Sequence, residues 1–96
     1  MQNYEEQVQK IREQVEAAFV KNAHNTVFID WITPEDREHI IDIGVSILVT
    51  KKKIGPPGGS FVQAVCNNDL IGAFGCADRV NQRAINFYCL LIYNLA

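Results

Sequence analysis

Residues 51–78 read KKKIGPPGGSFVQAVCNNDLIGAFGCAD and hold five of the six glycines and two of the three prolines of the chain. Glycine and proline are the residues that most often interrupt regular secondary structure, so this stretch is expected to carry the main turns. The segments on either side of it have the apolar spacing of helices. The sequence therefore predicts an all-α fold, a small helical bundle with a Pro/Gly-rich loop between the second and third helices.

Three helices are expected to begin inside or just after this stretch. Ser60 and Gln63 have the spacing of a capping box, with Ser60 as the cap of the first helix. Asp69 is the expected cap of a second short helix, which Gly75 closes, and Asp78 is the expected cap of the last one. The predicted helices cover residues 60–67, 69–75 and 79–95.

Two longer helices are predicted upstream, over residues 3–22 and 34–49. The second has a strong start, because Thr33 can cap it and Pro34 suits the first helical position. Gly44 inside this helix costs about 1 kcal/mol relative to alanine, so the close approach of a neighbouring helix is expected there. The connector between the two helices, residues 23–32, is too apolar for an exposed loop, and we expect it to run extended across the core with Trp31 buried.

Size and charge limit the class of protein. The chain has 96 residues, which suffice for one core and not for two, so residues 1–96 are treated as a single helical domain. A net charge of −2 argues against general nucleic-acid binding. The longest apolar run, residues 87–93, is too short to span a bilayer, and the first ten residues lack the apolar core of an export signal. We expect no membrane partner and a cytoplasmic location.

The sequence shows no pattern typical of a catalytic or metal site. His24 and His39 are isolated, and the three cysteines have no CxxC spacing, so no set of metal ligands is predicted. Neither GxGxxG nor GxxxxGK[ST] occurs, and a Cys–His nucleophile has no support from spacing. We therefore expect a protein that is not an enzyme and needs no cofactor.

The Pro/Gly-rich loop is the candidate binding site. A helix N-terminus offers unpaired N–H groups and a partial positive charge, and glycines allow a ligand to approach the backbone. Lysines just before the loop add attraction for an anion, although lysines are also favoured at any helix C-terminus. These features suit a phosphate or an acidic protein side chain alike. The candidate ligand-binding residues are Lys51, Lys52, Lys53, Gly58, Gly59 and Ser60.

Two long apolar stripes in so small a chain also predict self-association as a dimer or another closed oligomer. Each stripe can instead cover the core of the chain itself or dock on another protein. The candidate interface residues lie in the first and last predicted helices and are Tyr4, Val8, Ile11, Val15, Phe87 and Leu91.

The C-terminal half carries a combined pattern of fifteen residues. They are Pro57, Gly59, Phe61, Ala64, Val65, Asn68, Asp69, Leu70, Ala73, Phe74, Ala77, Asp78, Asn81, Tyr93 and Asn94. In this pattern the chain resembles a group of short phage-encoded accessory proteins, from which it departs by its long N-terminal helix and its three lysines before the loop. The resemblance transfers no catalytic residue, and it implies a phage protein made in the cytoplasm of a bacterial host.

Small phage proteins of this kind commonly act by binding, as inhibitors of host defence, as sponges for nucleotide signals or as transcription modulators. By this analogy we expect the protein to counter host defence by binding and sequestering a phosphorylated nucleotide signal. The alternative is a protein–protein inhibitor or adaptor that docks on a host defence enzyme or regulator through apolar helix faces.

Overall fold

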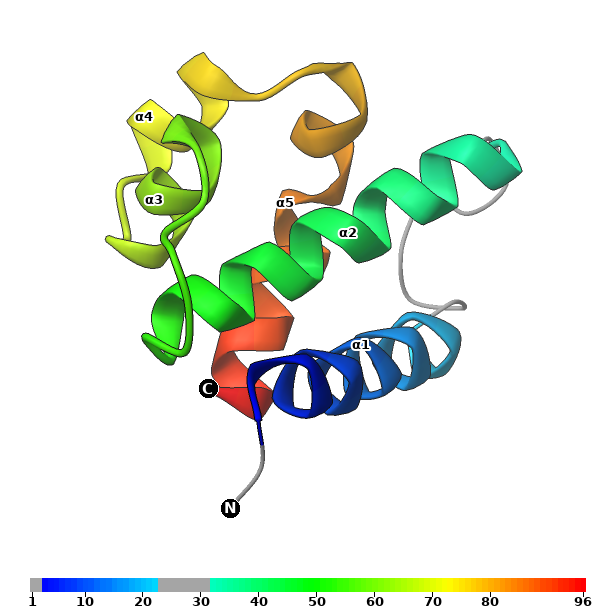
Figure 1. Cartoon of the computed structure of the whole chain (residues 1–96). Helices are drawn as coiled ribbons and strands as arrows, with labels where there is room; N and C mark the ends of the chain where they lie inside the picture. Colours follow the sequence, from blue (N-terminus) through cyan, green and yellow to red (C-terminus); the bar gives the residue numbers. More distant parts are fainter. Residues whose placement is uncertain (1–2, 23–31) are drawn as a thin grey trace.

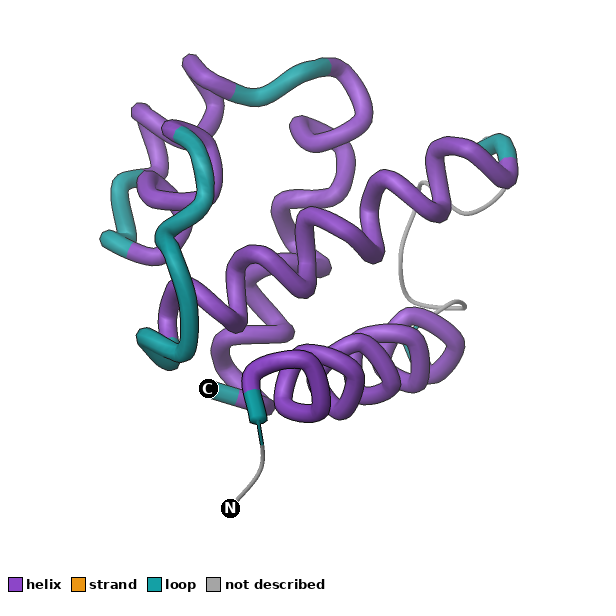
Figure 2. The backbone as a smooth tube through the Cα atoms, in the orientation of Figure 1, coloured by secondary structure: helices purple, strands orange, loops and turns teal. Residues whose placement is uncertain are grey.

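The computed structural model describes residues 3–22 and 32–96 and contains five helices and no strand within these ranges. The helices are α1 (Tyr4–Lys21), α2 (Pro34–Lys51), α3 (Ser60–Cys66), α4 (Leu70–Cys76) and α5 (Arg79–Leu95). The predicted all-α bundle is confirmed, and every helix end lies within two residues of its predicted position. Figure 2 shows the loop between α2 and α3, which is the predicted Pro/Gly-rich loop.

The helix α2 is the centre of the bundle. It runs through the middle of the molecule in Figure 1, and α1, α3 and α5 all pack on it. Its buried residues lie on several sides of the helix, which is typical of a helix enclosed by its neighbours rather than one with a single apolar face. They are Ile40, Ile41, Gly44, Val45, Ile47, Leu48 and Val49.

At Gly44 the central helix comes very close to two neighbours. A Cβ atom at this position would lie 2.8 Å from Leu91 Cδ1 of α5 and 2.9 Å from Val15 Cγ1 of α1. Both distances are shorter than real Cβ atoms tolerate, so only glycine fits here. The close helix approach that the sequence predicted at Gly44 is therefore confirmed.

The aromatic core lies between α5 and the helices around it. Phe87 meets Phe19 edge-on with ring centroids 5.6 Å apart, and Tyr88 meets Phe61 in the same way at 5.7 Å. The buried Tyr88 hydroxyl donates a hydrogen bond to Asn81 Oδ1 at 2.6 Å. Burial raises the pKa of the Tyr88 phenol, so it remains a hydrogen-bond donor across the physiological pH range.

Four of the six predicted interface residues belong to the core of the chain itself. Ile11, Val15, Phe87 and Leu91 are at most 4% exposed. Side chains this deeply buried have no surface left for a second copy, so we reassign them from an oligomer interface to the core. The seam spacing of α1 and α5 reflects packing within one chain, because α2 covers both stripes.

The other two predicted interface residues lie near the N-terminal end of α1. Val8 is half-buried against the core, and Tyr4 is 48% exposed. The Tyr4 ring lies on the Pro/Gly-rich loop, where a Cβ atom at Gly55 would lie 2.8 Å from the Tyr4 hydroxyl oxygen. The first turn of α1 therefore packs against the loop through this ring.

The predicted caps at Thr33, Asp69 and Asp78 are confirmed. Thr33 Oγ1 accepts from the Asp36 amide, and the Asp36 side chain accepts from the Thr33 amide in return. Asp69 Oδ1 accepts from the Gly72 amide at 2.9 Å, and Asp78 Oδ1 accepts from the Asn81 amide at 2.7 Å. These bonds satisfy N–H groups that a helix start leaves without partners, which fixes where α2, α4 and α5 begin.

The end of α2 has the hydrogen bonds of a Schellman motif. The Ile54 amide donates to the Val49 carbonyl at 3.1 Å, and the Lys53 amide donates to the Thr50 carbonyl at 3.2 Å. This geometry places Lys53 in the left-handed region with φ at 57°. Glycine usually occupies such a position, because a Cβ atom costs energy there.

We expect Lys53→Gly to raise the free energy of unfolding by about 1 kcal/mol, because it relieves the left-handed strain. Urea denaturation followed by circular dichroism measures the change. Lys52→Gly is the matched control: Lys52 has φ at −82° in the right-handed region, so this variant is expected to gain nothing. Equal effects of the two changes would contradict the assignment of strain to Lys53.

The predicted connector lies almost wholly outside the described residues, and so does Trp31. Ile32, just before the Thr33 cap, is half-buried and packs against the core. In the ranges that the structure describes, no helix has the length and apolar character needed to cross a membrane.

Candidate functional site

A hollow of about 410 Å³ lies where the end of α2, the Pro/Gly-rich loop and α3 meet. Its lining combines two lysines, two carboxamides and a threonine hydroxyl with loop backbone and a buried cysteine. The lining residues are Thr50, Lys51, Lys53, Gly55, Pro57, Gln63, Cys66 and Asn67.

The three predicted lysines fall into two groups. Lys51 and Lys53 line the hollow, whereas Lys52 is exposed and is not part of its lining. Lys51 Nζ donates a hydrogen bond to the Cys66 carbonyl oxygen at 3.1 Å, which holds this ammonium at the C-terminal end of α3. The ammonium group carries three donors, so this bond leaves two of them for a ligand.

Gly58 serves packing rather than ligand access. Its amide already donates to Thr50 Oγ1 at 2.9 Å, so it is not available to an anion. A Cβ atom at Gly58 would lie 2.5 Å from Ser46 Oγ and 2.7 Å from Val62 Cγ1. The glycine therefore lets the loop lie directly on α2 and α3, and a ligand-binding role for its backbone stays a prediction that its engaged amide does not support.

Gly59 and Ser60 lie outside the hollow. Gly59 is the N-cap of α3, and Ser60 is the first residue of that helix and is exposed. No side chain caps this helix, because the N-cap is Gly59 and not Ser60, and Gln63 Nε2 donates to the Gly58 carbonyl at 2.7 Å. The predicted capping box is therefore wrong, and the polar groups that face the hollow come from farther along α3.

Those groups are Gln63 and Asn67, which are not among the ligand-binding residues predicted from the sequence. They are four residues apart, so they lie on the same face of α3 and its C-cap. This spacing was visible in the sequence. It did not lead to a predicted site, because the predicted ligand-binding residues lay at the start of α3 rather than along its side.

Cys66 is a buried residue of the lining. Its Sγ donates to the Ile47 carbonyl at 3.4 Å inside the core. Burial raises the pKa of the Cys66 thiol more than the nearby Lys51 charge lowers it, so the thiol stays protonated near neutral pH. Cys66 is therefore a packing residue and not a nucleophile.

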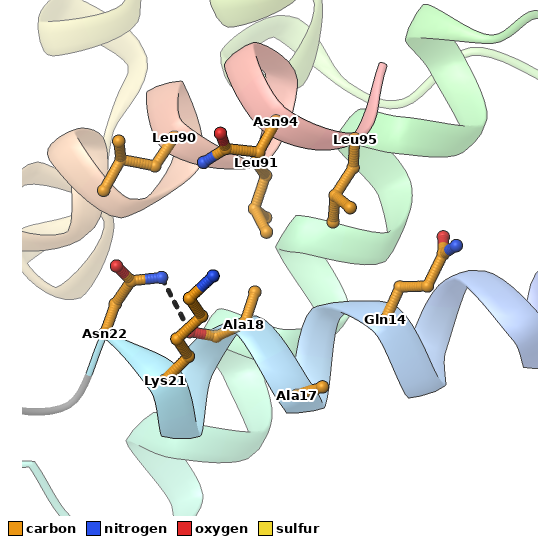
Figure 3. A pocket seen from close by; sticks show the side chains of 9 residues that line it. All are labelled: Gln14, Ala17, Ala18, Lys21, Asn22, Leu90, Leu91, Asn94 and Leu95. Carbon is orange, nitrogen blue, oxygen red and sulfur yellow. Dashed lines mark hydrogen bonds between the residues drawn. The ribbon is translucent and has the colours of Figure 1, made fainter.

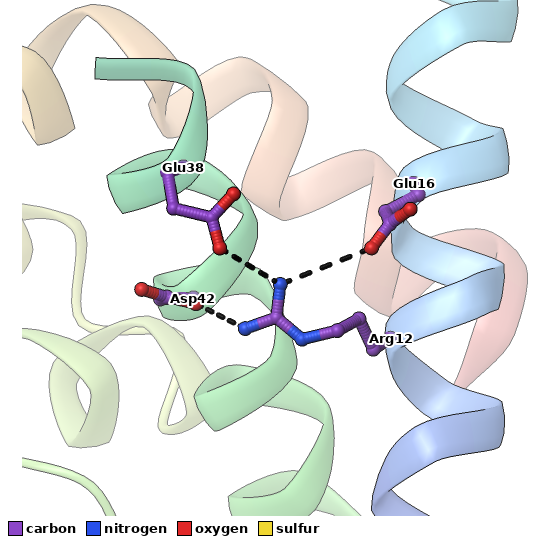
Figure 4. Close-up of polar contacts among 4 residues, drawn as sticks. All are labelled: Arg12, Glu16, Glu38 and Asp42. Atoms are coloured by element: carbon purple, nitrogen blue, oxygen red, sulfur yellow. Dashed lines mark hydrogen bonds and ion pairs between the residues drawn. The ribbon is translucent and has the colours of Figure 1, made fainter. Parts of the chain in front are cut away.

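The charged groups outside the hollow join helices to one another. Arg12 of α1 bonds to Asp42 of α2, and its Nη1 lies 3.4 Å from Glu38 and 3.9 Å from Glu16 (Figure 4). The hydrogen bond to Asp42 raises the pKa of the Arg12 guanidinium. The described residues contain no group of three side chains suited to hold a metal ion.

His39 has a similar structural role. Its Nε2 lies 3.0 Å from Oδ2 of Asp78, the carboxylate whose other oxygen caps α5. This contact ties α2 to the start of α5. Both polar atoms of the Asp78 carboxylate are thus engaged within the chain.

A second surface of interest is the apolar side of α4. Leu70, Ile71 and Phe74 are 61%, 86% and 45% exposed, and we call these three residues the α4 patch. Within α4 only Ala73 is buried. The sequence predicts exposed apolar faces on the first and last helices, whereas the structure places one on this short helix.

In comparisons with protein-family models, curated proteins and solved structures, the chain has no significant match.

Proposed function

We propose that the protein is a non-enzymatic binding protein that sequesters a small phosphorylated ligand, a nucleotide, in the hollow lined by Lys51 and Lys53. The observation that carries this proposal is that two lysines and two carboxamides from separate elements converge on one hollow of about 410 Å³. The phage origin and the role against bacterial defence rest on the resemblance of the C-terminal half.

Charge supports an anionic ligand. Lys51 is fixed by its bond to the Cys66 carbonyl, and Lys53 approaches from the turn after α2. Hydrogen bonds from ammonium groups to phosphate oxygens are stronger than bonds between neutral groups. No acidic residue is among the described residues that line the hollow, so none of them offsets these two positive charges.

Size and polarity support a nucleotide rather than a bare phosphate ion. A volume of about 410 Å³ falls within the range of pockets that bind small organic molecules. The carboxamides of Gln63 and Asn67 each have a donor and an acceptor, which is the chemistry needed to pair with the edge of a base. We infer that the phosphates lie on the lysines and the base lies toward α3.

The decisive test is calorimetric titration with a panel of mononucleotides and cyclic dinucleotides. We expect the double variant Lys51→Ala/Lys53→Ala to weaken binding by at least about 100-fold, because each of the two charged hydrogen bonds contributes roughly 1.5–3 kcal/mol. Lys52→Ala removes the same charge from the neighbouring position outside the hollow, and it is expected to change affinity by less than about threefold.

Two outcomes would contradict the proposal. One is the absence of binding of any nucleotide to the wild-type protein. The other is an equal loss in Lys52→Ala and in a single Lys51→Ala variant, which would indicate diffuse charge attraction without a site. Chromatography of the ligand released by denaturation completes the test, since a sequestering protein returns the nucleotide chemically unchanged.

The α4 patch favours a second function, the docking of a host protein. Three exposed apolar side chains on two turns of one helix are typical of a contact surface rather than of a solvated one. A partner that covered Leu70, Ile71 and Phe74 would remove their apolar area from water. The sequence predicts that a host protein would dock on α1 and α5. In the docking function proposed here, the contact surface is on α4 instead.

We expect Ile71→Asp to abolish capture of that partner from a bacterial lysate, because a carboxylate at the centre of an apolar contact has no partner. The matched control is Tyr93→Asp on α5, since Tyr93 is 84% exposed, much as Ile71 is 86% exposed, and lies outside the patch. Pull-down with mass spectrometry measures the result. Retention of the same partner by both variants would place the contact elsewhere.

A further inference from the structure

A groove of about 490 Å³ lies between the C-terminal halves of α1 and α5 (Figure 3). None of its lining residues lines the lysine hollow, so the two are separate sites. In Figure 3 the α5 side chains Leu91 and Leu95 point toward α1, and Lys21 of α1 extends toward α5.

The groove exists because α1 and α5 both pack mainly on α2 and touch each other only sparsely. On the α1 side the residues that face the gap include Ala17 and Ala18, whose methyl groups are too small to reach across it. A larger side chain at either position would fill the space that these alanines leave.

The lining is apolar at its base and polar at its edges. Ala18, Leu91 and Leu95 supply the apolar part, and the carboxamides of Gln14 and Asn94 lie at the edge. An apolar surface with a few polar groups is the usual composition of a small-molecule site, and its volume is in the usual range. The apolar base between two helices suits a flat ring system.

The positive charge of Lys21 favours an anionic group on the part of the ligand that lies beside it. Among the described residues that line the groove, Lys21 is the only charged one, so none of the others neutralises its ammonium. An anionic group beside Lys21 would gain a charge-assisted hydrogen bond, whereas a cationic group would be repelled.

We propose that the α1–α5 groove binds a small molecule that joins a planar apolar ring system to one anionic group. This inference stands on the groove alone and does not depend on nucleotide binding at the lysine hollow.

The test uses two fluorescent probes with nearly the same ring system. 8-Anilinonaphthalene-1-sulfonate carries one sulfonate, and N-phenyl-1-naphthylamine is its neutral counterpart. We expect saturable binding of the sulfonate at one site per chain, and about fivefold weaker binding of the neutral probe, because only the sulfonate interacts with Lys21.

Variants locate the site. Ala17→Trp, at an exposed position, is expected to weaken the sulfonate probe by at least about tenfold by filling the groove. Lys21→Gln is expected to weaken the sulfonate about fivefold and to leave the neutral probe unchanged. Lys10→Gln, an exposed lysine of α1 outside the groove, and Ile71→Asp, in the α4 patch, are the controls and are expected to bind as the wild type does.

The proposal is overturned if Ala17→Trp, folded by circular dichroism, binds the sulfonate as tightly as the wild type does. It is also overturned if Lys21→Gln weakens both probes equally, since the charge would then have no specific role. Loss of binding in Ile71→Asp would place the probe on the α4 patch and exclude the groove.

Discussion

Replacing Gly44 by leucine is expected to lower the free energy of unfolding by about 3 kcal/mol, a large fraction of the roughly 5–15 kcal/mol that stabilises a typical domain. Even the first carbon of the new side chain would lie 2.8 Å from Leu91 Cδ1 and 2.9 Å from Val15 Cγ1. Val15 and Leu91 are fully enclosed, and a close-packed interior has no free volume into which they can move. Either α1 or α5 must therefore shift away from α2.

Urea denaturation followed by circular dichroism measures this loss, with Gly75→Ala as the control. A Cβ atom at Gly75 would have no neighbour within 4 Å, so this change is expected to leave stability equal or to raise it by about 0.5–1 kcal/mol. A Gly44→Leu variant as stable as the wild type would show that α1 and α5 do not meet α2 at this residue.

Replacing Leu91 by aspartate is expected to unfold the protein, with a loss of more than about 4 kcal/mol. Leu91 is 1% exposed and lies against the Gly44 position of α2. A carboxylate there would lose its hydration without gaining a partner. Ile71→Asp makes the same kind of change at a side chain that is 86% exposed, and it is expected to leave the free energy of unfolding nearly unchanged.

Thermal denaturation together with size-exclusion chromatography separates the two roles that Leu91 can have. A core residue gives an unfolded variant. A folded Leu91→Asp variant that elutes as a monomer, from a wild type that elutes as an oligomer, would restore Leu91 to an interface between copies and would contradict its burial in one chain.

The positions of the helices were predictable because their ends are local. A cap such as Thr33 or Asp78 acts within three residues of itself, and the bonds that it makes are visible as sequence spacing. Ser60 was the exception. Gly59 takes the N-cap position, so the Gln63 side chain donates to the Gly58 carbonyl instead of accepting from the Ser60 amide, and the sequence does not show which of two neighbouring residues becomes the cap.

What covers each apolar stripe was not predictable from spacing. The seam of α1, with Ile11 and Val15, looks the same whether it faces α2 or a second chain, because periodicity describes one helix and not its partner. The reverse holds for α4, where Leu70 and Ile71 have the composition of a buried segment and are exposed. Exposure is a property of the whole bundle.

Only the part of the candidate site that lies in one continuous stretch of sequence was predicted. Lys51 and Lys53 stood out as a charged run beside glycines and prolines. Gln63 and Asn67 enter the site only because α3 folds back along the end of α2, and that packing depends on the tight fit of Gly58 against Ser46 and Val62. A contact between separate helices has no local sequence signal.

The central position of α2 also bears on the order in which the chain can fold. The packing of α1 on α2, of α3 on α2 and of α4 on α3 joins helices that are neighbours along the chain, and such contacts form quickly. The packing of α5 on α2 must close a loop that contains α3 and α4, which costs more entropy before any contact is gained. Until α5 arrives, the part of α2 that Leu91 covers at Gly44 remains exposed, and transiently exposed apolar surface of this kind is prone to aggregation during synthesis.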